Sequence, residues 1–223
     1  MLQHINLPHQ ESSIPLDVAR PTQDIRGGVL ILPSIFGNDE GTLSLAHTLA
    51  EHGLLAVVPA LFFRQDPGPC GFDAQGKERA FARMRTYQQE EGVQDLLVVV
   101  KWMREQLSHN PSAKLLAHGI CFGGHLAALL AQKKVVDALT TVHGGRLDQI
   151  SAQQNLTVPA SLHFGDQDSA IPLEKINSVQ KHWPQAEVVI HPNAQHGFAH
   201  PGSPFFVEDA YQKSLQKIVQ LAL

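Results

Sequence analysis

The sequence contains few cysteines, little net charge and no long apolar run. Its only cysteines are Cys70 and Cys121, too few for a disulfide framework. The formal net charge is -4 at pH 7, and the lysines and arginines form no cluster. Neither nucleic acid nor an anionic membrane surface is therefore a predicted partner. The partner that we expect is a small molecule.

Several other signals are missing. The amino-terminal residues lack the basic and apolar regions of a signal peptide, and no segment is long and apolar enough to span a membrane. The 13 histidines show no H-E-x-x-H pattern, and the cysteines show no C-x-x-C pattern. We therefore predict a cytoplasmic protein without a metal or cofactor, acting as a monomer or small homo-oligomer.

Short apolar runs rich in β-branched residues alternate with longer helical patterns. With 43% hydrophobic residues, a chain of 223 residues can bury one sizeable core, so we expect a single domain over residues 1–223. The alternation is typical of parallel strands joined by helices. It predicts an α/β fold of the α/β-hydrolase type, with a mostly parallel sheet and helices on both faces.

The same patterns predict the order of elements. An antiparallel edge hairpin is expected at residues 2–8 and 13–21, and a surface loop rich in Gly, Pro and Asp at residues 67–76. Residues 77–107 are expected to be helical, with an interruption near Gly92. Further strands are predicted at residues 28–32, 54–62, 113–119, 136–145, 158–168 and 186–192. Further helices are predicted at residues 41–53, 121–133, 172–183 and 203–223.

The segment HGICFGG places Cys121 where a predicted strand turns into a predicted helix. Gly119 and Gly123 lie two residues before and after it, which is the G-x-nucleophile-x-G pattern of a nucleophile elbow. Such a tight turn accommodates only very small side chains beside the nucleophile, and the N–H groups of the following helix favour the thiolate. The N–H groups of Phe122 and Ile35 are the predicted oxyanion donors. A buried core thiol is the alternative for an isolated motif of this kind.

Two later strands end in candidate partners for Cys121. The segment GDQDSAIP offers Asp166 and Asp168, and we choose Asp168 because it holds the acid position of the G-x-x-D-x-x-I-P arrangement. Asp166 is then interpreted as a turn residue, the commoner role of an aspartate directly after glycine. The segment QHGFAH offers His196, whose alternative is an ordinary histidine of a surface loop. The chain order Cys121, Asp168, His196 is the nucleophile, acid, histidine order of α/β-hydrolases. The histidines at positions 118, 125, 143, 163 and 191 are predicted to serve packing or to lie at the rim.

These segments resemble the dienelactone hydrolase family, the cysteine branch of the α/β-hydrolases. The similar motifs span nearly the whole chain, from IFG at 35–37 and GVQDL at 92–96 to GICFGG, HFGDQDSAIP and QHGFAH. The resemblance implies a catalytic triad of Cys121, Asp168 and His196, with Ile35 and Phe122 as the oxyanion hole. It also implies attack of Cys121 on a lactone or ester carbonyl, followed by hydrolysis of the thioester.

Two positions differ from the family pattern. Ser34 stands where the family has a glutamate that interacts with the thiol, and His200 stands where the family has an arginine for the substrate carboxylate. We expect Ser34, Phe36, Phe198 and His200 to border the substrate, with His200 able to bind an anion when it is protonated.

The predicted function is hydrolysis of small lactones or activated esters through a Cys121 acyl-enzyme. The connection over residues 142–158 is too short for a cap domain, so we expect an open pocket for small substrates, with aryl esters and thioesters as further candidates. The alternative is a thiol-sensing or ligand-binding protein on a hydrolase fold whose catalysis is lost or altered, which the serine at position 34 favours.

Overall fold

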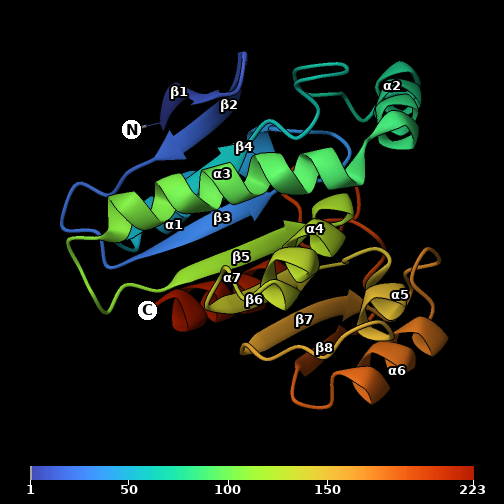
Figure 1. The fold of residues 1–223 in the computed structure, drawn as a ribbon. Helices are drawn as coiled ribbons and strands as arrows, with labels where there is room; N and C mark the ends of the chain where they lie inside the picture. Colours follow the sequence, from blue (N-terminus) through green and yellow to red (C-terminus); the bar gives the residue numbers. More distant parts are fainter. Residues whose placement is uncertain (1) are drawn as a thin grey trace.

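The computed structural model describes residues 2–223 and is built around a sheet of eight strands (Figure 1). They lie in the order β1-β2-β4-β3-β5-β6-β7-β8. β1 pairs antiparallel with β2, and β2 with β4, whereas all further neighbours pair in parallel. The predicted edge hairpin and mostly parallel sheet are confirmed. The strands are β1 (Leu2–His9), β2 (Ser12–Ala19), β3 (Gly27–Leu32), β4 (Leu54–Pro59), β5 (Leu115–Ile120), β6 (Ala138–Val142), β7 (Ala160–Gly165) and β8 (Glu187–His191).

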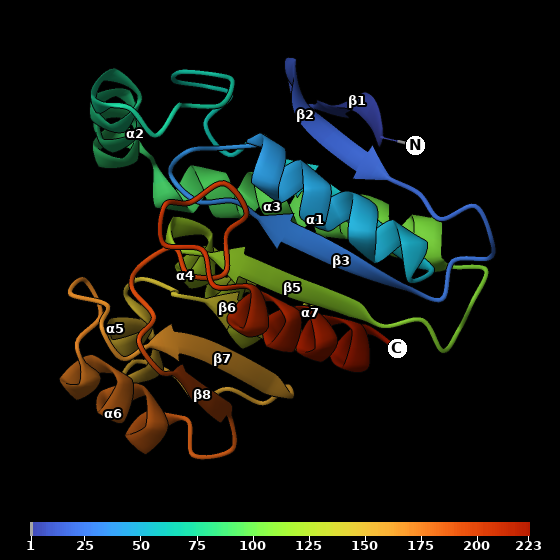
Figure 2. The same cartoon turned by 180° about the vertical axis from the view of Figure 1, so that it is seen from behind.

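Helices cover both faces of this sheet, as predicted. α1 (Glu40–Glu51) and α7 (Glu208–Ala222) lie on one face, and α3 (Gln89–Leu107), α4 (Phe122–Gln132) and α6 (Leu173–His182) lie on the other (Figures 1 and 2). Every residue of β3, β4 and β5 is buried. Strands that are covered on both sides have no solvent face, which is why they read in the sequence as continuous apolar runs.

The helical region between β4 and β5 differs from the prediction. It forms α2 (Ala74–Thr86) and α3, and the chain breaks at Tyr87, not near Gly92. Gly92 lies within α3, where a side chain would collide with the Tyr87 hydroxyl group. The glycine therefore makes room for a packed ring and does not interrupt the helix. The amino terminus of α2 is also earlier than predicted, because the side chain of Asp73 accepts a hydrogen bond from the Gly76 N–H and caps the helix.

The connection between β6 and β7 is short, as predicted. It contains one helix of five residues, α5 (Leu147–Ser151), so no cap domain covers the carboxyl ends of the strands at this point. None of the helices within residues 2–223 combines the length and the apolar character needed to cross a bilayer.

Several histidines are buried inside the fold. On β5, His118 Nδ1 lies 2.8 Å from Thr140 Oγ1, and on β7, His163 Nδ1 lies 2.9 Å from His191 Nε2. Burial lowers the pKa of His118 to about 3, and it lowers the pKa of His163 and of His125 to about 4. These rings are therefore neutral at neutral pH, as packing residues should be.

Acid should destabilise the protein through these histidines. The unfolded chain takes up their protons near pH 6.5, whereas the folded chain resists protonation of His118, His125 and His163 down to about pH 3 or 4. The free energy of unfolding should therefore fall as the pH is lowered from about 6.5 to 4, by up to ~1.4 kcal/mol per pH unit for each histidine. Urea denaturation at a series of pH values measures this slope.

His118→Gln should reduce that slope, and His109→Gln, which changes an exposed histidine, should leave it unchanged. An equal slope in wild type and in a folded His118→Gln protein would contradict the prediction.

Candidate active site

Cys121 lies in the tight turn between β5 and α4, at the carboxyl end of the sheet. Its backbone has a φ of 51° and a ψ of -110°, a strained conformation for a residue other than glycine. A side chain at Gly119 would collide with the backbone of Gly123, and one at Gly123 would collide with the carbonyl group of Leu32. The steric reason predicted for the two glycines is therefore confirmed, and Cys121 stands in an elbow that only glycines can flank.

The structure brings the side chains of Cys121, His196 and Asp168 into one line, in which each is in hydrogen-bond contact with the next. Cys121 Sγ lies 3.2 Å from His196 Nε2, and His196 Nδ1 lies 2.7 Å from Asp168 Oδ2. Asp168 Oδ1 accepts hydrogen bonds from the N–H groups of Ala170 and Ile171 at 2.9 and 3.3 Å. These bonds fix the buried carboxylate toward the histidine. Among the two candidate aspartates, Asp166 is exposed and does not contribute to this line.

The electrostatics of His196 follow from these neighbours. Burial by itself lowers the pKa of His196, but the hydrogen bonds and charges of Asp168 and Cys121 outweigh it and raise the pKa to about 10. The imidazole is therefore favoured in its protonated form at neutral pH. A protonated imidazole in this position is able to donate a proton to a group that leaves beside the sulfur atom.

The directions of the Phe122 and Ile35 N–H groups follow from the hydrogen bonds of the carbonyl groups that precede them. The carbonyl oxygen of Cys121 accepts hydrogen bonds from the N–H groups of Gly124 and Gly145, at 3.0 and 3.1 Å. Because N–H and C=O point in opposite directions across a trans peptide, the N–H of Phe122 is directed away from both glycines. In the same way, the Ser34 carbonyl accepts from the Gly37 N–H at 3.0 Å, which directs the N–H of Ile35 away from Gly37.

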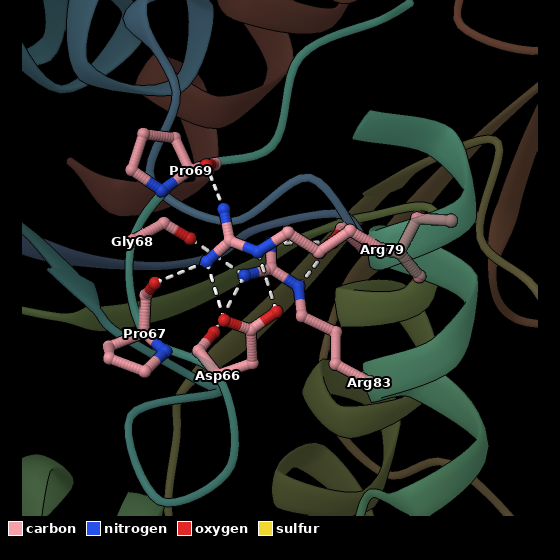
Figure 3. Close-up of polar contacts among 7 residues, drawn as sticks. Asp66, Pro67, Gly68, Pro69, Arg79 and Arg83 are labelled. Atoms are coloured by element: carbon pink, nitrogen blue, oxygen red, sulfur yellow. Dashed lines mark hydrogen bonds and ion pairs between the residues drawn. The ribbon is translucent and has the colours of Figure 1, made fainter. Parts of the chain in front are cut away.

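Arg83 ties the loop that carries Ile35 to the segment of residues 66–69, and Figure 3 shows its contacts with that segment. Its Nε and Nη2 donate to the Ile35 carbonyl at 2.9 and 2.7 Å, and its Nη1 donates to the carbonyls of Asp66 and Gly68 at 3.1 and 2.7 Å. Arg79 holds the Asp66 carboxylate with two bonds of 2.6 Å. Arg83 is 2% exposed, so it acts as a buried brace between two loops. Its role was not predicted, because an arginine in a polar helix gives no local sign of burial.

The residues predicted to border the substrate have different environments. Phe36 is half-buried and its ring lies 4.5 Å from that of Phe72, whereas Phe198 is fully buried. Ser34 is buried, and its Oγ accepts a hydrogen bond from the Phe36 N–H at 3.2 Å. His200 is buried with its Nε2 2.8 Å from Asp39 Oδ2. A carboxylate of the protein therefore already occupies the side of His200 that was expected to meet an anion.

His143 is a second residue whose environment the sequence did not reveal. It follows β6 with a φ of 39° and is 2% exposed. Its ring lies 4.6 Å from the ring of His196, and within residues 2–223 neither of its ring nitrogens has a hydrogen-bond partner. Burial and the neighbouring histidines lower its pKa well below the ordinary value. Its place directly after a strand, before Gly144 and Gly145, was the signal available in the sequence.

A separate cavity lies next to the loop that follows β3. It has a volume of about 360 Å³ and is lined by Gly37, Asn38 and Arg83 together with residues of β1 and β2, but not by Cys121 or His196. The cavity and the line of three side chains are therefore two distinct features of the surface.

Fold comparison defines the class of this protein. A structure from Klebsiella pneumoniae, provisionally assigned as a dienelactone hydrolase, has a TM-score of 0.85 at 22% identity and covers 99% of this chain and 97% of its own. A dienelactone hydrolase-like promiscuous phosphotriesterase from metagenomic libraries has a TM-score of 0.74 at 19% identity, with coverages of 99% and 96%. The fold is that of the α/β-hydrolases, as the order of strands and helices predicted.

Sequence comparison identifies the family. The model of the dienelactone hydrolase family matches residues 16–222. A carboxymethylenebutenolidase from Pseudomonas putida is 30% identical over 188 residues, covering 82% of this chain and 79% of that protein. Carboxymethylenebutenolidase 1 from Cupriavidus pinatubonensis is 28% identical over 199 residues, covering 86% and 84%. The chain belongs to the dienelactone hydrolase family, which confirms the predicted resemblance and makes the protein a hydrolase of that family.

Crowding around the elbow leads to a first stability prediction for this site. Gly123→Ala should lower the free energy of unfolding by about 1–3 kcal/mol, because the added methyl group must displace the backbone of β3. Gly145→Ala is the matched control, because a Cβ there would lie 3.9 Å from its nearest neighbour, the Cys121 carbonyl oxygen. Urea denaturation of both variants measures the difference, and equal stabilities would contradict the clash.

The buried guanidinium leads to a second stability prediction. Arg83→Met should lower the free energy of unfolding by about 2–4 kcal/mol, because buried backbone carbonyls lose a charged donor. Arg79→Met should cost about 1 kcal/mol or less, because the Arg79–Asp66 pair is partly exposed. Thermal and urea unfolding compare the two variants. A smaller loss for Arg83→Met than for Arg79→Met would show that the brace contributes little.

Proposed function

We propose that the protein hydrolyses small lactones or activated esters through a covalent Cys121 acyl-enzyme. The observation that carries the proposal is the line from Cys121 Sγ through His196 to Asp168, with separations of 3.2 and 2.7 Å. It supplies a nucleophile, a proton carrier and an acid that orients the carrier.

The reaction proceeds in two halves. The Cys121 thiolate attacks the carbonyl carbon, and the negative charge that forms on the carbonyl oxygen is stabilised by the N–H groups of Ile35 and Phe122. The intermediate collapses, the C–O bond to the leaving group breaks, and His196 donates its proton to the leaving oxygen. Water then gives a proton to His196 and attacks the thioester, which releases the carboxylic acid and regenerates Cys121.

The residues around Cys121 and the names of the relatives together support a class of substrate. Phe36 and Phe122 are half-buried aromatic side chains, and we assign them to the walls of the substrate site. Ser34 positions the oxyanion loop through its bond to the Phe36 N–H, and Phe198 supports the site from the core. We propose no anion-binding role for His200, because it is paired with Asp39. The relatives named carboxymethylenebutenolidase support a lactone as the first substrate to test.

Removal of the nucleophile tests this function. Cys121→Ala should abolish hydrolysis across a panel of lactone, aryl ester and thioester substrates, because it removes the sulfur atom that forms the proposed acyl-enzyme. Cys70→Ala is the control, since it removes the other cysteine and should retain activity. Mass spectrometry of the wild type with a slow ester should find the acyl group on Cys121.

Two outcomes would count against the proposal. Unchanged turnover by Cys121→Ala would remove Cys121 as the nucleophile. Rapid alkylation of Cys121 by iodoacetamide, combined with no hydrolysis of any ester in the panel, would instead favour a thiol-sensing or ligand-binding protein.

A further inference from the structure

His143 is a buried polar side chain for which the hydrolase reaction has no use. It is 2% exposed, and within the described chain its Nδ1 and Nε2 have no hydrogen-bond partner. An unpartnered buried polar group is costly and usually indicates a ligand or a special role. Its ring lies beside that of His196, with 4.6 Å between the centroids, so the unused nitrogens are at the edge of the candidate active site.

Three donor atoms converge at this point. Cys121 Sγ, one ring nitrogen of His143 and one of His196 all lie within 4.8 Å of one another. Donor atoms around a tetrahedral zinc ion lie about 3.3–3.6 Å apart, given Zn–N and Zn–S bonds of about 2.0 and 2.3 Å. The Cys121 and His196 donors are already 3.2 Å apart, so a movement of the His143 ring by up to about 1.5 Å would complete three ligand positions.

We propose that Cys121, His143 and His196 form a binding site for a divalent cation of the Zn²⁺ type, and that occupation of this site blocks the hydrolase. One thiolate and two imidazoles are ligands that zinc prefers. Binding forms one metal–sulfur and two metal–nitrogen bonds and releases to solvent the proton shared by Cys121 and His196, without any change of oxidation state. The binding site rests on the geometry of these three side chains, whereas the inhibition rests on the proposed function.

The neighbours of His196 suit this role. Asp168 holds His196 Nδ1 at 2.7 Å, which leaves Nε2 directed at Cys121. A carboxylate on the far nitrogen is the usual outer partner of a metal-bound histidine. The His196 side chain is 35% exposed, so the ion can approach from the solvent side while His143 closes the site from the protein interior.

Inhibition follows from the shared atoms. A cation on Cys121 Sγ removes the electron pair that would attack the carbonyl carbon, and a cation on His196 Nε2 removes the site that carries the proton. The metal-bound form is therefore inactive as a hydrolase, and only the metal-free form can catalyse the reaction. Removal of the ion by a chelator restores the free thiol.

Metal titration of the full-length protein tests the site directly. After treatment with a chelator, Co²⁺ should bind in a ratio of one per chain and produce a thiolate charge-transfer band, and Zn²⁺ should displace it. Cys121→Ser should lose the band. His143→Asn, which keeps a residue that tolerates a positive φ, should weaken binding by more than about tenfold. His47→Gln, which changes an exposed histidine on α1, should bind as the wild type does.

A second measurement does not depend on variants. On addition of Zn²⁺, the ring nitrogen resonances of His143 and His196 should shift together in an NMR spectrum of the wild type. In the hydrolase assay, the Zn²⁺ concentration that halves activity should match the affinity from the titration. Because the band and the NMR shifts are read without a substrate, a failure of the proposed hydrolase activity would leave this test intact.

Three results would overturn the inference. The first is an absence of any Co²⁺ band or Zn²⁺-induced NMR shift in the wild type. The second is wild-type affinity in a His143→Asn protein with a native circular dichroism spectrum, and the third is activation of hydrolysis by Zn²⁺.

Discussion

The left-handed turn at Cys121 is the constraint on which the rest of the site depends. It reverses the chain between β5 and α4 within one residue, and the Cys121 carbonyl is held at both sides by Gly124 and Gly145. The backbone conformation of Cys121 therefore determines both the position of its sulfur atom and the direction of the Phe122 N–H. Glycine at 119 and 123 is the only way to bring β3, β5 and α4 this close together.

The loop after β3, which carries the proposed second oxyanion donor Ile35, is held both by its own hydrogen bonds and by a side chain from α2. The loop after β3 carries Ile35, and Arg83 of α2 binds its carbonyl while also holding residues 66 and 68 (Figure 3). A guanidinium can satisfy several carbonyls at once because it has five N–H donors in one plane. The loop after β3, the segment after β4 and α2 are thus joined by one side chain, which links the stability of this region to the geometry of the Ile35 peptide.

Much of the fold was predictable because its signals are local. Apolar runs located the buried strands, and glycines and prolines located most of their ends. Two helix boundaries were predicted wrongly, because the residues concerned act through contacts that the apolar pattern does not show. Gly92 makes room for the Tyr87 ring within a helix and does not end it. Asp73 caps α2, so this helix begins earlier than the apolar pattern suggests. The pairing of His200 with Asp39 also left no local signal, because the two residues are distant in the sequence.

The order of strands and helices can be read from local patterns in the sequence. So can the three residues that follow strand ends, Cys121, Asp168 and His196, because each stands in a short motif with a steric or electrostatic reason. Which other groups meet there depends on how distant segments pack. The bond from Arg83 to the Ile35 carbonyl and the packing of the His143 ring beside that of His196 are contacts between segments far apart in the chain. The physical reason is that burial and hydrogen-bond satisfaction belong to the packed molecule and not to any stretch of its sequence.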